Sequence, residues 1–364
     1  MTDLRKSPDL QADDSAAGDS AVGDSAVGDG AAAIAPAGPV DRSPLYSRIG
    51  QGLQQMLAFG TLIGLVVIFS IASPNFFTES NITSILLATA VIGILAVGTT
   101  LVIITGGIDL SIGTGMALCA VVTGLLLINA DMPVFVGVLG GIGTGALLGL
   151  INGFNVAYLR LPSFIATLAM MLVAGGLALV FANVRPIYLD KVPGFPGIAL
   201  GSIGFKIPNA VYILFALAIV FGLILAKTVL GRMTYAIGSN EEATRLSGIN
   251  TRRWTLAIYA LAGVATGLAG VVIASQLRSA QPQIGQGYEL QAIAAVVIGG
   301  TSLLGGRGSI LGTLIGALIM SVLINGLRIL SIQPEWQNVV VGAVVLVAVF
   351  TDQLRKRRAE GGGS

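Results

Sequence analysis

Residues 82–105 read Ile-Thr-Ser-Ile-Leu-Leu-Ala-Thr-Ala-Val-Ile-Gly-Ile-Leu-Ala-Val-Gly-Thr-Thr-Leu-Val-Ile-Ile-Thr, an apolar run without a charged side chain. A helix of about 20 apolar residues is long enough to cross a hydrocarbon core ~30 Å thick. This stretch therefore predicts a transmembrane helix. Comparable runs predict about ten spans in all, the others lying near 53–72, 109–129, 133–155, 162–182, 207–227, 253–275, 289–304, 309–331 and 336–351.

The composition supports the same interpretation. Of the 364 residues, 54% are hydrophobic and 10% are charged, and the mean hydropathy is +0.87. A soluble domain carries about 25% charged residues, so this chain cannot cover itself with a polar surface. We expect an all-α polytopic membrane protein whose transmembrane domain spans residues 49–354. Only the connections near 183–206 and 228–252 are long, which leaves no room for a second globular domain.

Both ends of the chain differ from this apolar body. Residues 1–48 are rich in Asp, Ser, Ala and Gly, with too little apolar surface to offset the entropy of ordering. We expect a disordered, acidic cytoplasmic tail there and a basic cytoplasmic tail at residues 355–360. The closing Gly-Gly-Gly-Ser of 361–364 is expected to be a linker outside the fold.

The residue types present exclude several classes of chemistry. The chain has no histidine and one cysteine, Cys119, so neither a His-based metal site nor a Ser-His-Asp triad can be assembled. Lys227-Thr228 does not follow a glycine-rich turn, so it cannot cradle phosphates as a Walker A loop does. We therefore predict no catalytic residue, no metal site and no cofactor on this chain.

The basic residues predict the orientation, because Lys and Arg are retained preferentially on the cytoplasmic side. With the N-terminus inside and ten spans, most of the 20 Lys and Arg residues fall inside. Both termini and the loop at 228–252 are then cytoplasmic. The cations predicted outside are Arg185, Lys191, Lys206, Arg278 and Arg328.

The two halves of the chain share short elements. Leu150-Ile-Asn-Gly153 matches Leu323-Ile-Asn-Gly326, and Gly107-Ile-Asp-Leu110 matches Gly287-Tyr-Glu-Leu290. An odd number of spans between corresponding elements makes them run in opposite directions through the bilayer. The pattern predicts inverted-repeat halves, which are common in transporters and place a substrate path between them. Chance similarity between apolar stretches is the alternative.

Glycines recur every four residues in two predicted spans. Small residues at that spacing form a flat stripe that lets two helix backbones approach closely. We interpret both stripes as packing surfaces rather than a nucleotide-binding loop, because no strand or acidic partner accompanies them. The glycines are Gly137, Gly141, Gly145, Gly149 and Gly153 in one span and Gly308, Gly312 and Gly316 in the other.

The segment 231–253 is the longest stretch between spans on the predicted cytoplasmic side. Asn240 or Ser239 can cap a short helix, Glu241 and Glu242 suit its positive end, and Gly248 can end it. Such a short helix would project from the membrane domain and offer a binding surface to a partner protein. A solvated amphipathic connector explains these residues equally well when the loop is considered alone.

This segment resembles the coupling segment of the bacterial ABC importer permeases of the ribose and related monosaccharide family, which includes fructose and xylose permeases. The family pattern is Gly-x-Asn-x-x-Ala-x-x-x-Ser-Gly-Ile. Two further family motifs match residues 106–113 and 299–309, and the resemblance covers about 60–352. The loop pattern is met by Gly238, Asn240, Ala243, Ser247, Gly248 and Ile249.

The resemblance implies a type II-like ABC importer permease, a binding-protein-dependent subunit in the bacterial inner membrane that moves a monosaccharide such as ribose or fructose. It implies a second permease copy, identical or paralogous, surrounding membrane lipid, and a periplasmic sugar-binding protein. No nucleic-acid partner is expected. ATP and Mg²⁺ would lie on a cytoplasmic ABC ATPase, which docks the residues Gly238, Asn240, Glu241, Glu242, Ala243, Arg245, Ser247, Gly248 and Ile249.

Polar residues within or beside the spans are candidates for the translocation path, because ionisable groups in a membrane are costly. Asp109 with Ser111 can alternatively cap the next helix, and the two Asn side chains can join neighbouring helices. The candidates are Asp109, Ser111, Asn152, Glu289, Gln291 and Asn325.

Other functions compete with sugar import. Related permeases share these motifs, so a branched-chain amino acid or another small polar solute is an alternative substrate. A secondary transporter is the alternative class, although proton coupling normally requires carboxylates or histidines within the bundle.

Overall fold

The computed structural model describes residues 44–204 and 206–361, and the side chains of 56–204 and 206–353. The predicted acidic tail lies almost wholly outside the described residues, as do residues 362–364. The elements are α1 (Pro44–Ala72), α2 (Glu79–Ile104), α3 (Ile112–Ile128), α4 (Val134–Ala157), α5 (Ser163–Phe181), β1 (Ile187–Tyr188), α6 (Gly197–Leu200), α7 (Asn209–Lys227), α8 (Val229–Ser239), α9 (Glu241–Leu246), α10 (Thr251–Leu277), β2 (Ser279–Ala280), α11 (Tyr288–Ile298), α12 (Ile310–Ile329) and α13 (Pro334–Gly361).

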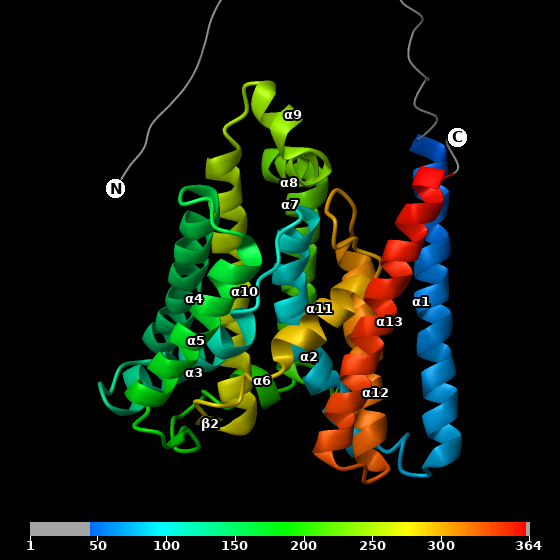
Figure 1. Cartoon of the computed structure of the whole chain (residues 1–364). Helices are drawn as coiled ribbons and strands as arrows, with labels where there is room; N and C mark the ends of the chain where they lie inside the picture. The colour runs from blue at the N-terminus through cyan, green and yellow to red at the C-terminus, as the bar shows by residue number, and fades with distance from the viewer. Residues whose placement is uncertain (1–43, 205, 362–364) are drawn as a thin grey trace, which may run out of the picture. The chain divides into compact units, whose positions relative to one another are not determined.

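The described part is helical apart from β1 and β2, which pair antiparallel with Ile187 opposite Ala280. By length and composition, 7 of the described helices can cross a membrane: α2, α4, α5, α7, α10, α12 and the 334–353 part of α13. Three predicted spans fall on shorter apolar helices, namely 56–72 of α1, α3 and α11. The expectation of an all-α membrane protein is therefore confirmed (Figure 1).

Two predicted spans are shortened at one end in the structure, because the chain turns there. The span predicted at 289–304 ends at Ile298, because Gly300 has a φ of 96° and the chain turns into a loop there. The span predicted at 109–129 begins as a helix only at Ile112, after Gly106 with a φ of 80°. With 11 residues, α11 is too short to cross the bilayer by itself, and α3, with 17 residues, is at the lower limit of about 17.

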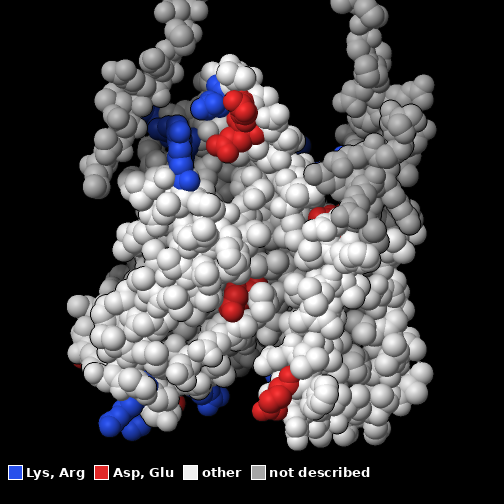
Figure 2. Space-filling view, in the orientation of Figure 1, with Lys and Arg blue, Asp and Glu red and all other residues white. Residues whose placement is uncertain are grey.

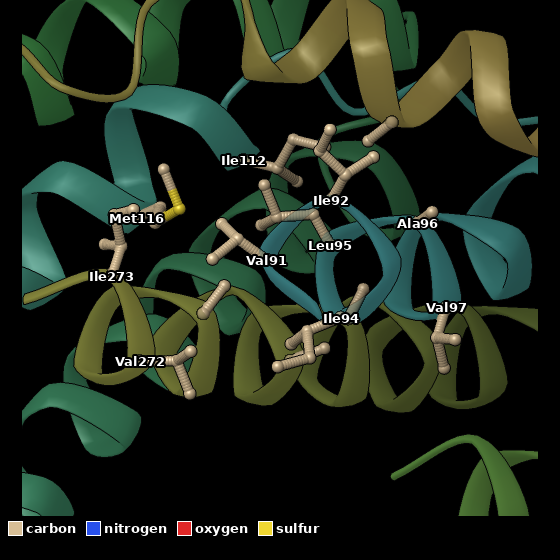
Figure 3. Packing of buried hydrophobic residues seen from close by; sticks show 14 of the residues in the cluster. Val91, Ile92, Ile94, Leu95, Ala96, Val97, Ile112, Met116, Val272 and Ile273 are labelled. Carbon is tan, nitrogen blue, oxygen red and sulfur yellow. The ribbon is translucent and has the colours of Figure 1, made fainter. Parts of the chain in front are cut away.

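Helix α2 lies at the centre of the bundle. It packs against α7, α10, α11 and α12, and every residue from Thr89 to Ile104 is buried. Figure 3 shows Val91, Ile94 and Leu95 of α2 among Ile112 of α3 and Val272 of α10. Because α2 is apolar on all sides, it is suited to a position surrounded by other helices.

Helices α4 and α10 form a close backbone contact along the predicted glycine stripe. A Cβ atom at Gly145 would overlap the carbonyl oxygen of Gly263, and a Cβ at Gly263 would overlap that of Gly145. Gly149 lies against the backbone of Tyr259 in the same way. The packing interpretation of this stripe is confirmed, and it brings Tyr259 close to α4.

We predict that Gly145→Leu destabilises the fold, because the new side chain must separate two backbones that are in contact. Overpacking of this kind costs about 1–3 kcal/mol or more. Gly143 is the matched control, since it lies on the same helix and a Cβ there meets nothing within 4 Å. Thermal unfolding in detergent should show a lower midpoint for Gly145→Leu than for Gly143→Leu, and equal midpoints would contradict the contact.

Candidate functional site

The predicted coupling segment forms two short helices at one end of the bundle, α8 and α9 (Figure 1). Thr228 caps α8 by accepting a hydrogen bond from the Gly231 N–H, at 3.3 Å. Asn240 caps α9 by accepting from the Ala243 N–H, at 2.9 Å. The capping prediction for Asn240 is confirmed, and Gly248, with a φ of 82°, follows the end of α9.

Gly238 of α8 lies where three segments meet. A Cβ at this position would overlap the carbonyl oxygen of Ile104, at the end of α2, and would lie 2.5 Å from the Gly306 backbone nitrogen. The Gly306 N–H itself donates to the Ile104 carbonyl at 2.8 Å. A Cβ at Gly305 would also lie 2.8 Å from the Gly238 carbonyl oxygen and 2.9 Å from the Gly106 nitrogen, so the three glycine-containing motifs at 106–113, 238–249 and 299–309 converge here. We call the contact of Gly238, Ile104 and Gly306 the glycine junction.

Two further hydrogen bonds attach the coupling segment to its surroundings. The Tyr235 hydroxyl of α8 donates to the Gly308 carbonyl at 2.8 Å, and burial raises the pKa of Tyr235. The Thr251 hydroxyl, at the start of α10, donates to the Glu241 carboxylate at 3.1 Å. By contrast, the ion pair of Glu242 with Arg245 is exposed and adds little stability. Glu241 thus links α9 to the start of α10, while Glu242 and Arg245 remain available to a partner.

Three of the predicted path residues form one buried network. The Ser111 hydroxyl and the Ser111 N–H both donate to the Asp109 carboxylate, at 2.6 and 2.9 Å. The Asn152 amide of α4 donates to the Ser111 hydroxyl at 2.8 Å. Asp109, Ser111 and Asn152 are 3%, 4% and 1% exposed. The network joins the chain between α2 and α3 to α4, as the interhelical interpretation of Asn152 predicted. The helix-capping alternative for Asp109 and Ser111 was wrong, because no side-chain hydrogen bond caps the start of α3.

Hydroxyl groups of α5 also bind the irregular segment 105–111 between α2 and α3, which we call the break. These hydroxyl groups were not predicted from the sequence. Ser163 accepts from the Ile108 N–H at 3.1 Å, and Thr167 accepts from the Leu110 N–H at 3.1 Å. These bonds satisfy backbone donors that a helix would otherwise have paired. The four-residue spacing of Ser163 and Thr167 was the available signal, since it places both hydroxyls on one face of an apolar helix.

A cavity of about 570 Å³ lies beside the break and the coupling segment. This volume suits a small molecule, whose sites span roughly 300–1,000 Å³. Hydroxyl groups of Thr105, Ser163, Thr255 and Tyr259 line it together with the Gly106-Gly107 backbone. Glu241, Glu242 and Arg245 of α9, with Arg160 and Arg252, complete the lining. The cavity is thus bounded by both the helix break and the coupling segment.

The other candidates for the translocation path are not part of the network of Asp109, Ser111 and Asn152. Glu289, in the first turn of α11, accepts from the Gly287 N–H at 3.1 Å, and its other carboxylate oxygen is buried without a partner. That oxygen lies against Gly113, near the start of α3. Gln291, which follows Glu289 by two residues in α11, is partly buried. Asn325 of α12 is 7% exposed, and its carbonyl oxygen has no partner.

On the face shown in Figure 2, charged side chains lie mainly toward two ends of the helical part, and the wide band between them is white apart from a few acidic side chains. Such a band is what a hydrocarbon layer requires. No group of three or more Cys, Asp or Glu side chains in the described ranges is placed to hold a metal ion.

Comparison with known proteins identifies similar sequences over most of the chain. Residues 81–349 match the family described as branched-chain amino acid transport system / permease component. The ribose import permease protein of Bacillus subtilis (strain 168) is 46% identical over 84% of this chain and 94% of that protein. The L-arabinose transport system permease protein of Escherichia coli (strain K12) is 38% identical, over 82% and 91%. No solved structure matches the chain.

We predict that Ser111→Ala and Asn152→Leu are not additive, because each removes the same buried hydrogen bond. A double-mutant cycle of unfolding free energies in detergent should give a coupling of about 1 kcal/mol. Asn325→Leu is the control, because its carbonyl oxygen has no partner to lose. It should combine with Ser111→Ala additively, to within ~0.5 kcal/mol. Additivity of the Ser111 and Asn152 variants would remove the network.

Proposed function

The chain belongs to the family of branched-chain amino acid transport system permease components, and we propose that it is the membrane subunit of an ATP-driven importer for a monosaccharide. The substrate would be a pentose or a hexose such as ribose or fructose. The strongest support is the set of relatives at 37–46% identity, whose names specify ribose, fructose and L-arabinose. The chain is a multi-pass membrane protein similar to bacterial permeases, and the bacterial inner membrane with both termini cytoplasmic fits its basic residues.

The lining of the 570 Å³ cavity is also compatible with a sugar. Its lining offers hydroxyl groups and backbone atoms from Thr105, Gly106, Ser163 and Tyr259, which can exchange hydrogen bonds with sugar hydroxyls. A branched-chain amino acid remains the second candidate, because the family description names it.

In this proposal, ATP hydrolysis on the partner would be coupled to transport through α8 and α9. In this proposal a partner ATPase binds ATP and Mg²⁺ and docks the segment 238–249 of this chain. The glycine junction gives the docked segment a direct contact with the end of α2 and with the loop 299–309. A displacement of α8 by the ATPase would therefore press on the break that carries Asp109. This arrangement favours an ATP-driven importer over a secondary transporter.

The substrate path would lie between inverted-repeat halves. The short helices α3 and α11 each follow an irregular segment and each begin beside an acidic residue, Asp109 and Glu289. Their starting segments touch, since a Cβ at Gly285 would overlap the carbonyl oxygen of Gly113. Broken helices that meet within a bundle are typical of transporter substrate sites. A periplasmic sugar-binding protein and a second permease copy would complete the machine.

We predict that the reconstituted transporter, with its ATPase and binding protein, takes up labelled ribose in an ATP-dependent way. Unlabelled fructose or arabinose should be tested as competitors, with leucine as the alternative substrate. Competition by leucine alone would contradict the sugar assignment. Uptake without ATP, driven by an ion gradient, would instead identify a secondary transporter.

We predict that Glu241→Arg, Arg245→Glu and Gly248→Pro each separate ATP hydrolysis from uptake. The first removes the link to Thr251, the second reverses an exposed charge, and the third places a ring where φ is positive. Uptake per ATP should fall at least about tenfold while the amount of folded protein is unchanged. Lys191→Glu is the control, because this exposed residue is predicted on the opposite side of the membrane. Normal coupling in all three variants would remove the assignment.

A further inference from the structure

The side chain of Tyr259 in α10 ends in a hydroxyl group that nothing in the fold engages. Tyr259 is 1% exposed, and its hydroxyl is buried without a hydrogen-bond partner. Among the described side chains, seven buried polar atoms lack a partner, and Tyr259 is the one of these residues that lines the 570 Å³ cavity. An unpaired buried polar group costs about 1–3 kcal/mol. This hydroxyl therefore needs a partner that the described residues do not supply.

The surroundings of the Tyr259 hydroxyl place it between the break and α5. A Cβ at Gly107 would lie 2.7 Å from it, so the absence of a side chain at Gly107 leaves room for the hydroxyl. The Ser163 hydroxyl is near but forms no hydrogen bond with it, and accepts instead from the Ile108 N–H at 3.1 Å. Gly149 of α4 packs directly on the Tyr259 carbonyl oxygen. The side chain is thus presented from a tightly packed part of α10.

Thr255 carries a second free hydroxyl on the same wall of the cavity. It precedes Tyr259 by one helical turn, which places both side chains on one face of α10. Thr255 lines the cavity and is 8% exposed. A threonine within a helix can donate to the carbonyl four residues earlier, as Thr266 does to Ala262 at 3.1 Å. The Thr255 hydroxyl makes no such bond within the described residues.

An uncharged polyol has the chemistry that this pair of hydroxyl groups requires. Each protein hydroxyl can donate one hydrogen bond and accept others, and so can each hydroxyl group of a sugar. The carboxylates that line the cavity are already engaged, because Glu241 accepts from Thr251 and Glu242 pairs with Arg245. A sugar can therefore bind the hydroxyls of α10 without displacing a bond of the fold.

We propose that Thr255 and Tyr259 form the sugar-binding subsite of this cavity, each holding one hydroxyl group of the monosaccharide on its way toward the coupling segment. This inference rests on the proposed function, since it names the residues that recognise the imported sugar. The Tyr259 hydroxyl is covered in the present conformation. A shift of the break at Gly107 exposes it to the sugar, which supplies the missing hydrogen bond.

The test is binding of labelled ribose to the purified complex of this chain with its ATPase, without binding protein and without ATP. Tyr259→Phe and Thr255→Val each remove a hydroxyl and keep the shape of the side chain. Each variant should bind ribose about tenfold more weakly. One monodeoxy analogue of ribose should bind a given variant as tightly as it binds the natural sequence, because the hydrogen-bonded pair is already broken. Tyr212→Phe on α7, outside the cavity, is the matched control and should leave binding unchanged.

Thermal unfolding of the variants separates sugar binding from a structural role. Tyr259→Phe breaks no hydrogen bond of the described residues, so its unfolding midpoint in detergent should not fall. Tyr235→Phe should lower the midpoint, because it removes the bond to the Gly308 carbonyl. A fall for Tyr259→Phe as large as that for Tyr235→Phe would reveal a structural partner of the Tyr259 hydroxyl and overturn the proposal.

The outcomes distinguish this subsite from the proposed function. Unchanged ribose binding in both Thr255→Val and Tyr259→Phe would overturn the subsite, while ATP-dependent ribose uptake by the natural sequence would still support a sugar importer. Binding of ribose 5-phosphate but not of ribose would assign the cavity to an anion held by Arg160 and Arg252, and this result would also overturn the proposal. A natural sequence that neither binds nor takes up ribose would contradict the proposed function, and the subsite with it.

Discussion

The backbone contact at Gly238 constrains the rest of the transport architecture. Helix α8 can reach the carbonyl oxygen of Ile104 only because Gly238 has no side chain, and the Gly306 N–H binds the same carbonyl. Three segments distant in sequence are thereby fixed at one point. In the proposed mechanism, a displacement of the exposed helix α9 would reach the end of α2 through these contacts between backbone atoms. Such a rigid connection suits the transfer of a movement from a partner into the membrane.

The polar groups inside the bundle are consistent with this role. A carboxylate buried in a membrane is costly unless hydrogen bonds compensate it, and Asp109 receives two from Ser111. Asn152 ties that pair to α4, whose glycine face lies on α10 beside Tyr259. The break between α2 and α3 is therefore stable, although it interrupts a helix within the bundle. It can remain irregular there because the hydroxyls of Ser163 and Thr167 replace lost backbone partners.

Length and apolar composition were sufficient to predict the helices, because every membrane crossing must satisfy its own backbone groups. The glycine stripe of α4 and the cap at Asn240 were also predictable, since both depend on local spacing. The early end of α11 and the late start of α3 were not, because their limits depend on how Gly300 and Gly106 turn in the folded chain. Asp109, Ser111 and Asn152 form one network because α3 packs on α4. The sequence pattern does not indicate how close these three side chains lie.

The central claim is that the glycine junction transmits the action of the ATPase to the break at Asp109. The most direct measurement is the ratio of sugar uptake to ATP hydrolysis in the reconstituted complex carrying Gly238→Ala. Alanine favours a helix over glycine by about 1 kcal/mol, so any loss cannot come from helix propensity. Gly222→Ala on α7, where a Cβ meets nothing within 4 Å, is the control. The account predicts that hydrolysis continues while uptake falls sharply in Gly238→Ala alone. An unchanged ratio in both variants would contradict it.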